Sequence, residues 1–216
     1  MKPFKKSLFI FHRDLRIVDN QGLEKALTES QEVLPIFIFD PAQIEESNRY
    51  RSMPGLQFML ESLEDLSSQF VKKGGKLFLF YGAPEEIVVS LIKKEGIDAV
   101  FSNRDYTPFA QQRDGWLEKV VKKEKASWFL VDDLLLCNPD EVFTTQGTPY
   151  TVYTAFLKKV VHIKVKEPNK HVPGAFCSSQ RSGDISLSSF RKKFLKRSLD
   201  LAQKGGRHES QKILDH

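Results

Sequence analysis

The sequence has little of several features that define large protein classes. Among 216 residues there are only two cysteines, Cys137 and Cys177, which excludes a disulfide framework and a paired-cysteine metal site. The longest apolar runs, such as residues 33–39, are far shorter than the ~20 residues that a bilayer-spanning helix needs. The apolar stretch near the N-terminus, residues 8–11, is too short for a secretory signal. We therefore expect a cytoplasmic protein without a membrane partner.

Common catalytic motifs are missing as well. The sequence contains no G-x-G-x-x-G after its first strand-like run, no G-x-x-x-x-G-K-[ST] phosphate loop and no G-x-S-x-G nucleophile elbow. No two histidines stand at the spacing of metal ligands on one face of a helix. We therefore predict neither a catalytic residue nor a metal site in this chain.

What the sequence does contain is a regular alternation of strand and helix patterns. Apolar runs rich in β-branched and aromatic residues recur at 7–11, 33–39, 76–81, 98–102 and 127–131. Most are apolar at consecutive positions, which is typical of strands buried on both faces of a parallel sheet. Helical patterns lie between and after them, at 57–71, 84–95, 105–125 and 149–161. The pattern predicts an α/β fold with a doubly wound, five-stranded parallel sheet and helices on both faces.

The helix predicted over residues 57–71 shows how these patterns are read. Its apolar positions recur every three or four residues, and they are Phe58, Leu60, Leu63, Leu66 and Phe70. Gly74 and Gly75 follow at once, as expected after the end of a helix. The spacing therefore predicts a helix that ends before the glycine pair.

The composition changes after residue 161. Residues 162–216 hold 12 Lys and Arg against 5 Asp and Glu, whereas residues 1–161 hold 21 against 23. Six serines occur between residues 177 and 189, a composition typical of a linker. We interpret 1–161 as one α/β domain, and 162–216 as a basic linker with the start of a further domain. Such a basic tail is either a solvated linker or a weak, salt-sensitive contact for nucleic-acid phosphates.

Polar side chains follow three of the predicted strands. Residues 12–20 come after the first strand, Asp40 after the second, and residues 103–106 after the fourth. Because the carboxyl ends of parallel strands meet at one edge of a sheet, these side chains are expected to share one crevice. Arginines, carboxylates and aromatic rings there suit either a structural ion-pair network or a ligand with polar edges, and both interpretations stay open.

Three segments resemble the photolyase and cryptochrome family. Residues 12–20, H-R-D-L-R-I-V-D-N, are similar to the family's R-D-L-R-x-x-D-N. Residues 103–114, N-R-D-Y-T-P-F-A-Q-Q-R-D, are similar to N-x-D-Y-x-P-x-A-x-x-R-D, and residues 147–158, G-T-P-Y-T-V-Y-T-A-F-L-K, to G-x-P-Y-x-V-[FY]-x-x-F-x-K. The resemblance covers residues 7–161 and points to the family's N-terminal α/β domain. Residues 205–207 resemble the start of the linker into its second domain.

The resemblance implies the light-harvesting chromophore domain of a DNA photolyase. Members of this family repair cyclobutane pyrimidine dimers in DNA by light-driven electron transfer from reduced FAD, which is held in a helical C-terminal domain. The N-terminal domain houses a second, antenna chromophore that passes energy to the FAD. The FAD site and the DNA contacts are thus expected in a domain that this chain lacks, and the chain alone is not expected to repair DNA.

The resemblance also implies the residues of the antenna site. Arg13, Phe37, Asp40 and Asp105 match residues that line the pocket of members with a deazaflavin or flavin antenna, and Asn103 belongs to the same motif. Phe37 can stack on a flavin-like ring while the charged groups bond its polar edges. A deazaflavin or FMN is favoured over a folate, because folate-binding members tend to carry Asn-Glu at positions 109–110, where this sequence has Phe-Ala.

Two other functions stay open at this point. One is a stand-alone flavin- or nucleotide-binding module, although such modules usually carry glycine-rich phosphate loops. The other is a photosensory fragment of the cryptochrome type, which the N-terminal domain does not distinguish from a photolyase. In either photolyase or cryptochrome, the face that docks the helical domain is expected to expose apolar side chains, which predicts self-association.

Overall fold

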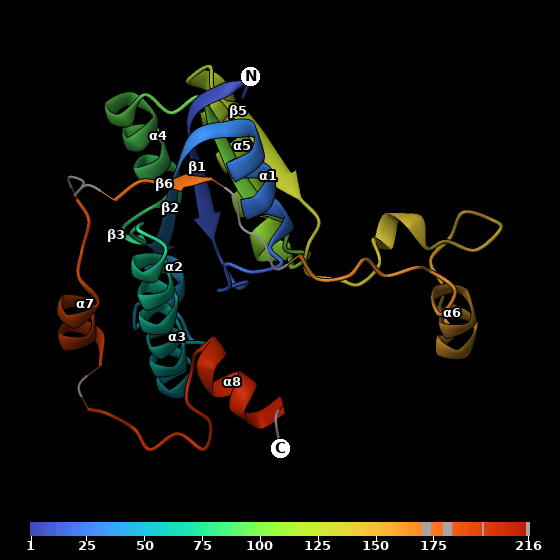
Figure 1. Ribbon diagram of the computed structural model, residues 1–216. Coiled ribbons are helices and arrows are strands. Elements are labelled where there is room, and N and C mark those ends of the chain that lie inside the picture. The colour runs from blue at the N-terminus through green and yellow to red at the C-terminus, as the bar shows by residue number, and fades with distance from the viewer. Residues whose placement is uncertain (170–173, 179–182, 196, 215–216) are drawn as a thin grey trace.

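A parallel β-sheet forms the centre of the computed structural model, which describes residues 1–169, 174–178, 183–195 and 197–214 (Figure 1). The strand order is β3-β2-β1-β4-β5, and every pairing along this path is parallel. The five strands are β1 (Phe4–Phe11), β2 (Ser30–Phe39), β3 (Phe78–Tyr81), β4 (Ala99–Asn103) and β5 (Ser127–Val131). The predicted doubly wound α/β fold is confirmed. The order reverses between β1 and β4, which is the place where such sheets open a ligand crevice.

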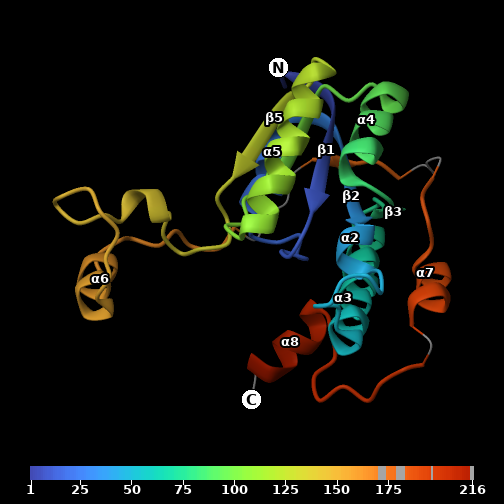
Figure 2. The same ribbon diagram turned by 180° about the vertical axis from the view of Figure 1, so that it is seen from behind.

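Helices cover both faces of the sheet. On one face lie α1 (Gln21–Glu29) and α3 (Met53–Lys72), and on the other lie α4 (Pro84–Glu95) and α5 (Pro108–Lys123) (Figures 1 and 2). A short helix, α2 (Pro41–Ile44), follows β2. Successive strand residues point to opposite faces, so Phe9 packs in the core under α1 and α3 while Leu8 packs in the core under α4 and α5. The consecutive apolar residues of β1 are explained by these two cores.

Capping residues define where the helices begin and end. The Asn20 side chain accepts a hydrogen bond from the backbone N–H of Leu23 and caps α1, and Thr107 caps α5 in the same way through Ala110. Gly96 ends α4 in the left-handed conformation, with φ of 65°. These caps keep the residues after β1 and β4 free of regular structure, next to the carboxyl edge of the sheet.

Part of the segment predicted to be a linker packs on this domain. Strand β6 (Ala175–Phe176) pairs in parallel with Glu32 and Val33 of β2. The physical reason is the length of β3: it covers only Ile36–Phe39 of β2, so the first half of that edge would be unpaired without β6. The sheet therefore has six strands among the described residues, and Cys177, which directly follows β6, is buried.

The helix that follows, α7 (Leu187–Phe194), also belongs to the folded domain. Phe190 is 3% exposed and stacks on Phe39, with ring centroids 3.7 Å apart and planes 19° from parallel. Between β6 and α7, the Asp184 carboxylate pairs with the Lys76 ammonium and accepts a hydrogen bond from the Leu79 backbone N–H at 2.9 Å. These contacts could not be predicted from the serine-rich composition, because they are made by a few aromatic and acidic residues within it.

Residues 134–165, here called the arm, extend away from the sheet. They include a 3-10 turn, Pro139–Glu141, and the helix α6 (Tyr153–Val160), which lies apart from both helical layers (Figures 1 and 2). No residue of α6 is buried. The arm exposes apolar side chains, and the most exposed of them are Leu135, Leu136, Val152, Tyr153, Val161 and Val165. No helix in the described ranges is both long and apolar enough to cross a membrane.

Candidate functional site

A cleft of about 930 Å³ opens at the carboxyl ends of β1, β2 and β4. Its position is the point where the strand order reverses, and its size lies within the usual range for small-molecule sites. Apolar side chains make up much of its wall, and charged groups stand among them. The wall includes Arg13, Leu15, Phe37, Phe58, Asp105 and Phe109. Three of the five predicted site residues, Arg13, Phe37 and Asp105, are therefore brought together.

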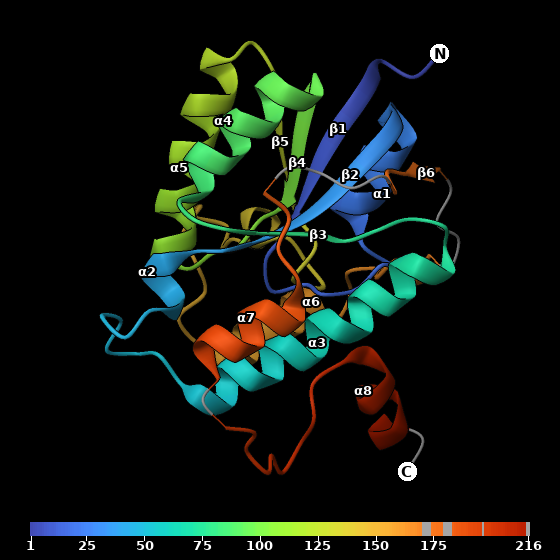
Figure 3. The ribbon, with the colours of Figure 1, turned by 90° about the vertical axis from the view of Figure 1, so that its left-hand side faces the viewer.

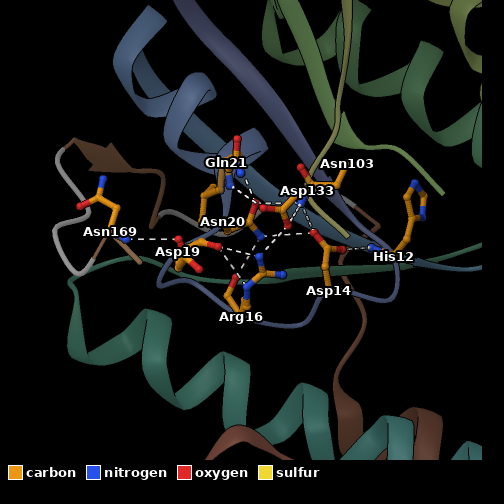
Figure 4. A network of polar contacts seen from close by, with 10 residues as sticks. His12, Asp14, Arg16, Asp19, Asn20, Gln21, Asn103, Asp133 and Asn169 are labelled. Carbon is orange, nitrogen blue, oxygen red and sulfur yellow. Dashed lines mark hydrogen bonds and ion pairs between the residues drawn. The ribbon is translucent and has the colours of Figure 1, made fainter. Parts of the chain in front are cut away.

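A buried polar network holds the loop after β1 in place (Figure 4). The amide nitrogen of Asn103 donates to the carboxylate of Asp14, to Asn20 Oδ1 at 2.9 Å and to Asp133 Oδ2 at 3.0 Å. Arg16 Nη2 donates to the same Asp133 oxygen at 2.7 Å. Burial raises the pKa of the Asp14 carboxyl, although the hydrogen bond from Asn103 acts in the opposite direction. Within the charged turn, Asp14 and Arg16 belong to this network, and Arg13 lines the cleft.

Asn103 supports the cleft but does not line it. Its side chain is buried, and it joins the end of β4 to the loop after β1. Gly22 of α1 lies so close that a Cβ there would stand 2.1 Å from Asn103 Oδ1. Asp133, the other carboxylate of this network, was missed in the sequence, although the acidic pair at residues 132–133 directly after β5 is the signal that marks it.

The mouth of the cleft carries a loose ion pair. Arg13 Nη1 and Asp105 Oδ2 are 3.6 Å apart, and the Arg13 side chain is 67% exposed. A hydrogen bond fixes the orientation of the Asp105 carboxylate: its Oδ1 accepts from the Thr107 backbone N–H at 3.0 Å. A carboxylate held by a backbone hydrogen bond, beside an exposed guanidinium, can bind a ligand edge that offers both an acceptor and a donor.

Beneath the cleft lies a second group of titratable residues. Burial, together with the nearby Arg113 charge, lowers the pKa of the His12 imidazole well below its ordinary value. His12 is therefore neutral, and its Nε2 has no hydrogen-bond partner among the described residues. Arg113 Nη2 pairs with Asp114 Oδ1 at 2.8 Å, and burial raises the pKa of the Asp114 carboxyl. This base of the cleft is structural, since its charges are paired to each other.

Asp40 is outside the cleft lining, contrary to the position expected from its place after β2. Its carboxylate caps α2 by accepting a hydrogen bond from the Ala42 backbone N–H at 2.9 Å. Burial raises the pKa of this carboxyl. The proline at position 41 starts a helix at once, and the Asp40 side chain turns back to cap it instead of reaching the ligand crevice.

A wall that the sequence did not predict closes the cleft from the side of α3. It comes from α3 and from α8 (Arg207–Leu214), which lies beside α3 in Figure 3. Phe58, the first apolar position of the helical pattern, is 43% exposed and lines this wall. The helical periodicity of residues 57–71 is real, but Phe58 lies at the edge of the apolar stripe, where the cleft begins.

Specific contacts hold α8 in this position. The Asp65 carboxylate of α3 accepts hydrogen bonds from the backbone N–H groups of Arg207, at 2.8 Å, and His208, at 3.4 Å. Gly205 approaches so closely that a Cβ there would lie 2.1 Å from the Phe58 carbonyl oxygen, and Gly206 has φ of +113°. The glycine pair that resembles the start of a linker therefore lets the chain return to α3 and close the cleft.

Comparison with known protein families matches residues 7–174 to the DNA photolyase model. This chain belongs to the DNA photolyase family. A deoxyribodipyrimidine photo-lyase of Synechococcus sp. is 29% identical over 151 residues, which are 70% of this chain and 31% of that protein. Cryptochrome-2 of Gallus gallus is 29% identical over 176 residues, 79% of this chain and 29% of its own length. The chain thus spans about a third of these curated relatives.

The solved structures include an archaeal photolyase from Sulfolobus tokodaii with the same fold. It superposes with a TM-score of 0.86 at 34% identity, over 98% of this chain and 46% of its own. That protein was crystallised with two FAD molecules, and its description points to a novel light-harvesting cofactor. The match extends beyond residue 161, in agreement with the packing of β6, α7 and α8 on the α/β domain.

Proposed function

We propose that this chain is the light-harvesting domain of a DNA photolyase and binds a flavin-class chromophore, FMN, FAD or a deazaflavin, in the cleft. The observation that carries this proposal is the lining of the cleft. Phe37, Phe58 and Phe109 offer flat apolar surfaces at the carboxyl edge of the sheet, and Arg13 and Asp105 stand at its mouth.

The donor set fits an isoalloxazine or deazaflavin ring. Such a ring has an apolar body, which stacks on aromatic side chains, and an edge with two carbonyl groups on either side of an N–H. Arg13 is a donor for a carbonyl and Asp105 an acceptor for the N–H, and their separation of 3.6 Å leaves both groups available to a ligand. When bound, the chromophore supplies absorption of near-ultraviolet and blue light.

Spectroscopy of the purified chain tests this proposal. Absorption and emission are recorded before and after addition of FMN, a deazaflavin and a reduced folate. We expect shifted or quenched flavin or deazaflavin emission, no change with the folate, and at least tenfold weaker binding in Arg13→Gln and Phe37→Ala. Arg49→Gln is the matched control, since Arg49 is exposed and does not line the cleft. Failure of all three chromophores to bind would overturn the proposal.

The whole protein's role in DNA repair is a further part of the proposal. The name of the Synechococcus relative supports a light-driven repair of pyrimidine dimers, and the similarity to a cryptochrome supports a photosensory role equally at this level of identity. We assign no catalytic residue to this chain, so it is expected to leave pyrimidine dimers in ultraviolet-irradiated DNA unchanged under blue light. Dimer loss catalysed by the chain alone would contradict that assignment.

A further inference from the structure

The wall formed by α8 gives the cleft a further cation, Arg207, which is one of the lining residues. Within the part of the chain that the structure describes, the Arg207 side chain has no ion-pair or hydrogen-bond partner. Two other arginines of the lining differ in this respect: Arg16 pairs with Asp133 at 2.7 Å and Arg113 with Asp114 at 2.8 Å. Arg13 is bridged only loosely to Asp105. The accessible charge of the cleft is therefore positive on two of its walls.

We propose that Arg207 makes the cleft selective for a chromophore that carries a phosphate group, FMN or FAD, over a flavin without one. This inference rests on the proposed function and names the feature of the ligand that the site recognises. A half-buried guanidinium binds a phosphate through charge-assisted hydrogen bonds, which are stronger than those between neutral groups. The neutral flavin ring would leave Arg207 without such a partner.

The backbone at the start of α8 does not provide this recognition. The N–H groups of Arg207 and His208 already donate to the Asp65 carboxylate, so they are not available to an anion. The recognition belongs to the Arg207 side chain, and Asp65 acts as a positioning residue that fixes where that side chain enters the cleft. Gly205 and Gly206 are required for the same reason, because a side chain at either position would push α8 off α3.

FMN and riboflavin provide the probe, since they share one ring and differ by a single phosphate. Dissociation constants are measured for both by quenching of flavin emission, at low and high salt. The wild-type chain is expected to bind FMN about tenfold more tightly than riboflavin, a difference equal to one charge-assisted hydrogen bond. Arg207→Gln should bind FMN as weakly as riboflavin, while its affinity for riboflavin stays at the wild-type value. High salt should reduce the preference for FMN.

Two further variants make the result specific. Lys212→Gln removes the same charge from α8, but Lys212 pairs with Glu209 and does not line the cleft, so the preference for FMN should persist. Asp65→Asn should reduce the preference because α8 is held less firmly. Equal binding of FMN and riboflavin by the wild-type chain would overturn this inference and leave flavin binding itself intact. Absence of binding by either flavin would overturn both.

Discussion

Replacing Phe190 with alanine tests whether the segment after residue 161 is part of the folded domain. Phe190 is 3% exposed, stacks on Phe39 at 3.7 Å and contacts Phe194 at 4.5 Å between ring centroids. A Phe→Ala change in a core costs ~3–5 kcal/mol, and each aromatic pair contributes ~0.5–1.5 kcal/mol of this. Because α7 lies at the surface and can settle into the space, we expect a loss of about 2–3 kcal/mol in the free energy of unfolding.

Urea denaturation followed by tryptophan emission measures this loss. With a slope of about 2 kcal/mol per molar urea, the unfolding midpoint should fall by roughly 1 M. Trypsin gives an independent readout, since Arg191, Lys192 and Lys193 lie within α7 and should be cleaved faster once the helix leaves the sheet. Phe143→Ala is the control: Phe143 belongs to the arm, is 39% exposed and should change the midpoint little.

A wild-type urea midpoint together with a wild-type cleavage rate in Phe190→Ala would contradict a stabilising role for α7. That result would mean that α7 makes no net contribution to stability and that residues 187–194 behave as the linker that their composition suggests. An unchanged midpoint with faster cleavage would place the whole effect in the local detachment of α7, and would contradict its predicted share in global stability.

Three other changes have defined outcomes. The lowered pKa of His12 means that the unfolded chain binds more protons than the folded chain below about pH 6.5, so stability should fall as the pH is lowered through that range. Between pH 7.5 and 5.5, the urea midpoint of His12→Gln should fall less than that of the wild-type chain. An equal fall in both would contradict the lowered pKa of His12. Asn103→Leu removes three hydrogen bonds to buried acceptors on Asp14, Asn20 and Asp133, so urea unfolding should show a loss of about 2–4 kcal/mol. A loss below about 1 kcal/mol would argue against the network. Leu136→Asp should reduce concentration-dependent self-association in sedimentation velocity, because Leu136 is 81% exposed on the arm; a wild-type chain that stays monomeric at every concentration would disprove the predicted association.

The positions of the strands could be predicted because β1, β2, β3 and β4 are largely buried on both faces, and β5 is half-buried. Burial on both faces requires apolar residues at consecutive positions, and this pattern is visible without knowing which strands or helices pack against it. The edge of the sheet was a different case. The need for β6 arises only because β3 is shorter than β2, and the two residues that fill the gap carry no strand pattern of their own. Whether one strand is shorter than its partner cannot be predicted from the sequence of either strand alone.

The candidate site also has residues whose position could be predicted from the sequence and residues whose position could not. Arg13, Phe37 and Asp105 could be predicted because the carboxyl ends of parallel strands must meet at one edge, whatever the details of the fold. Asp40 and Asn103 satisfy the same rule of position, but their side chains hydrogen-bond elsewhere, to α2 and to the buried network. Where a polar side chain points depends on which unsatisfied group lies nearest, and that is a property of the assembled structure.

The amino-acid sequence by itself determined the α/β class of this protein, the order of β1 to β5 and of α3, α4 and α5 along the chain, and the edge of the sheet at which the cleft opens. Hydrophobic periodicity and helix caps act over a few residues and are therefore visible in the sequence. Only the tertiary structure decided that α8 returns to α3 and brings Arg207 to that cleft. The contacts that hold it there join residues more than 140 positions apart, between Asp65 and the backbone of a segment with no apolar pattern. Every residue other than proline carries a backbone N–H, whatever its side chain, so a hydrogen bond from that group cannot be predicted from the residue types.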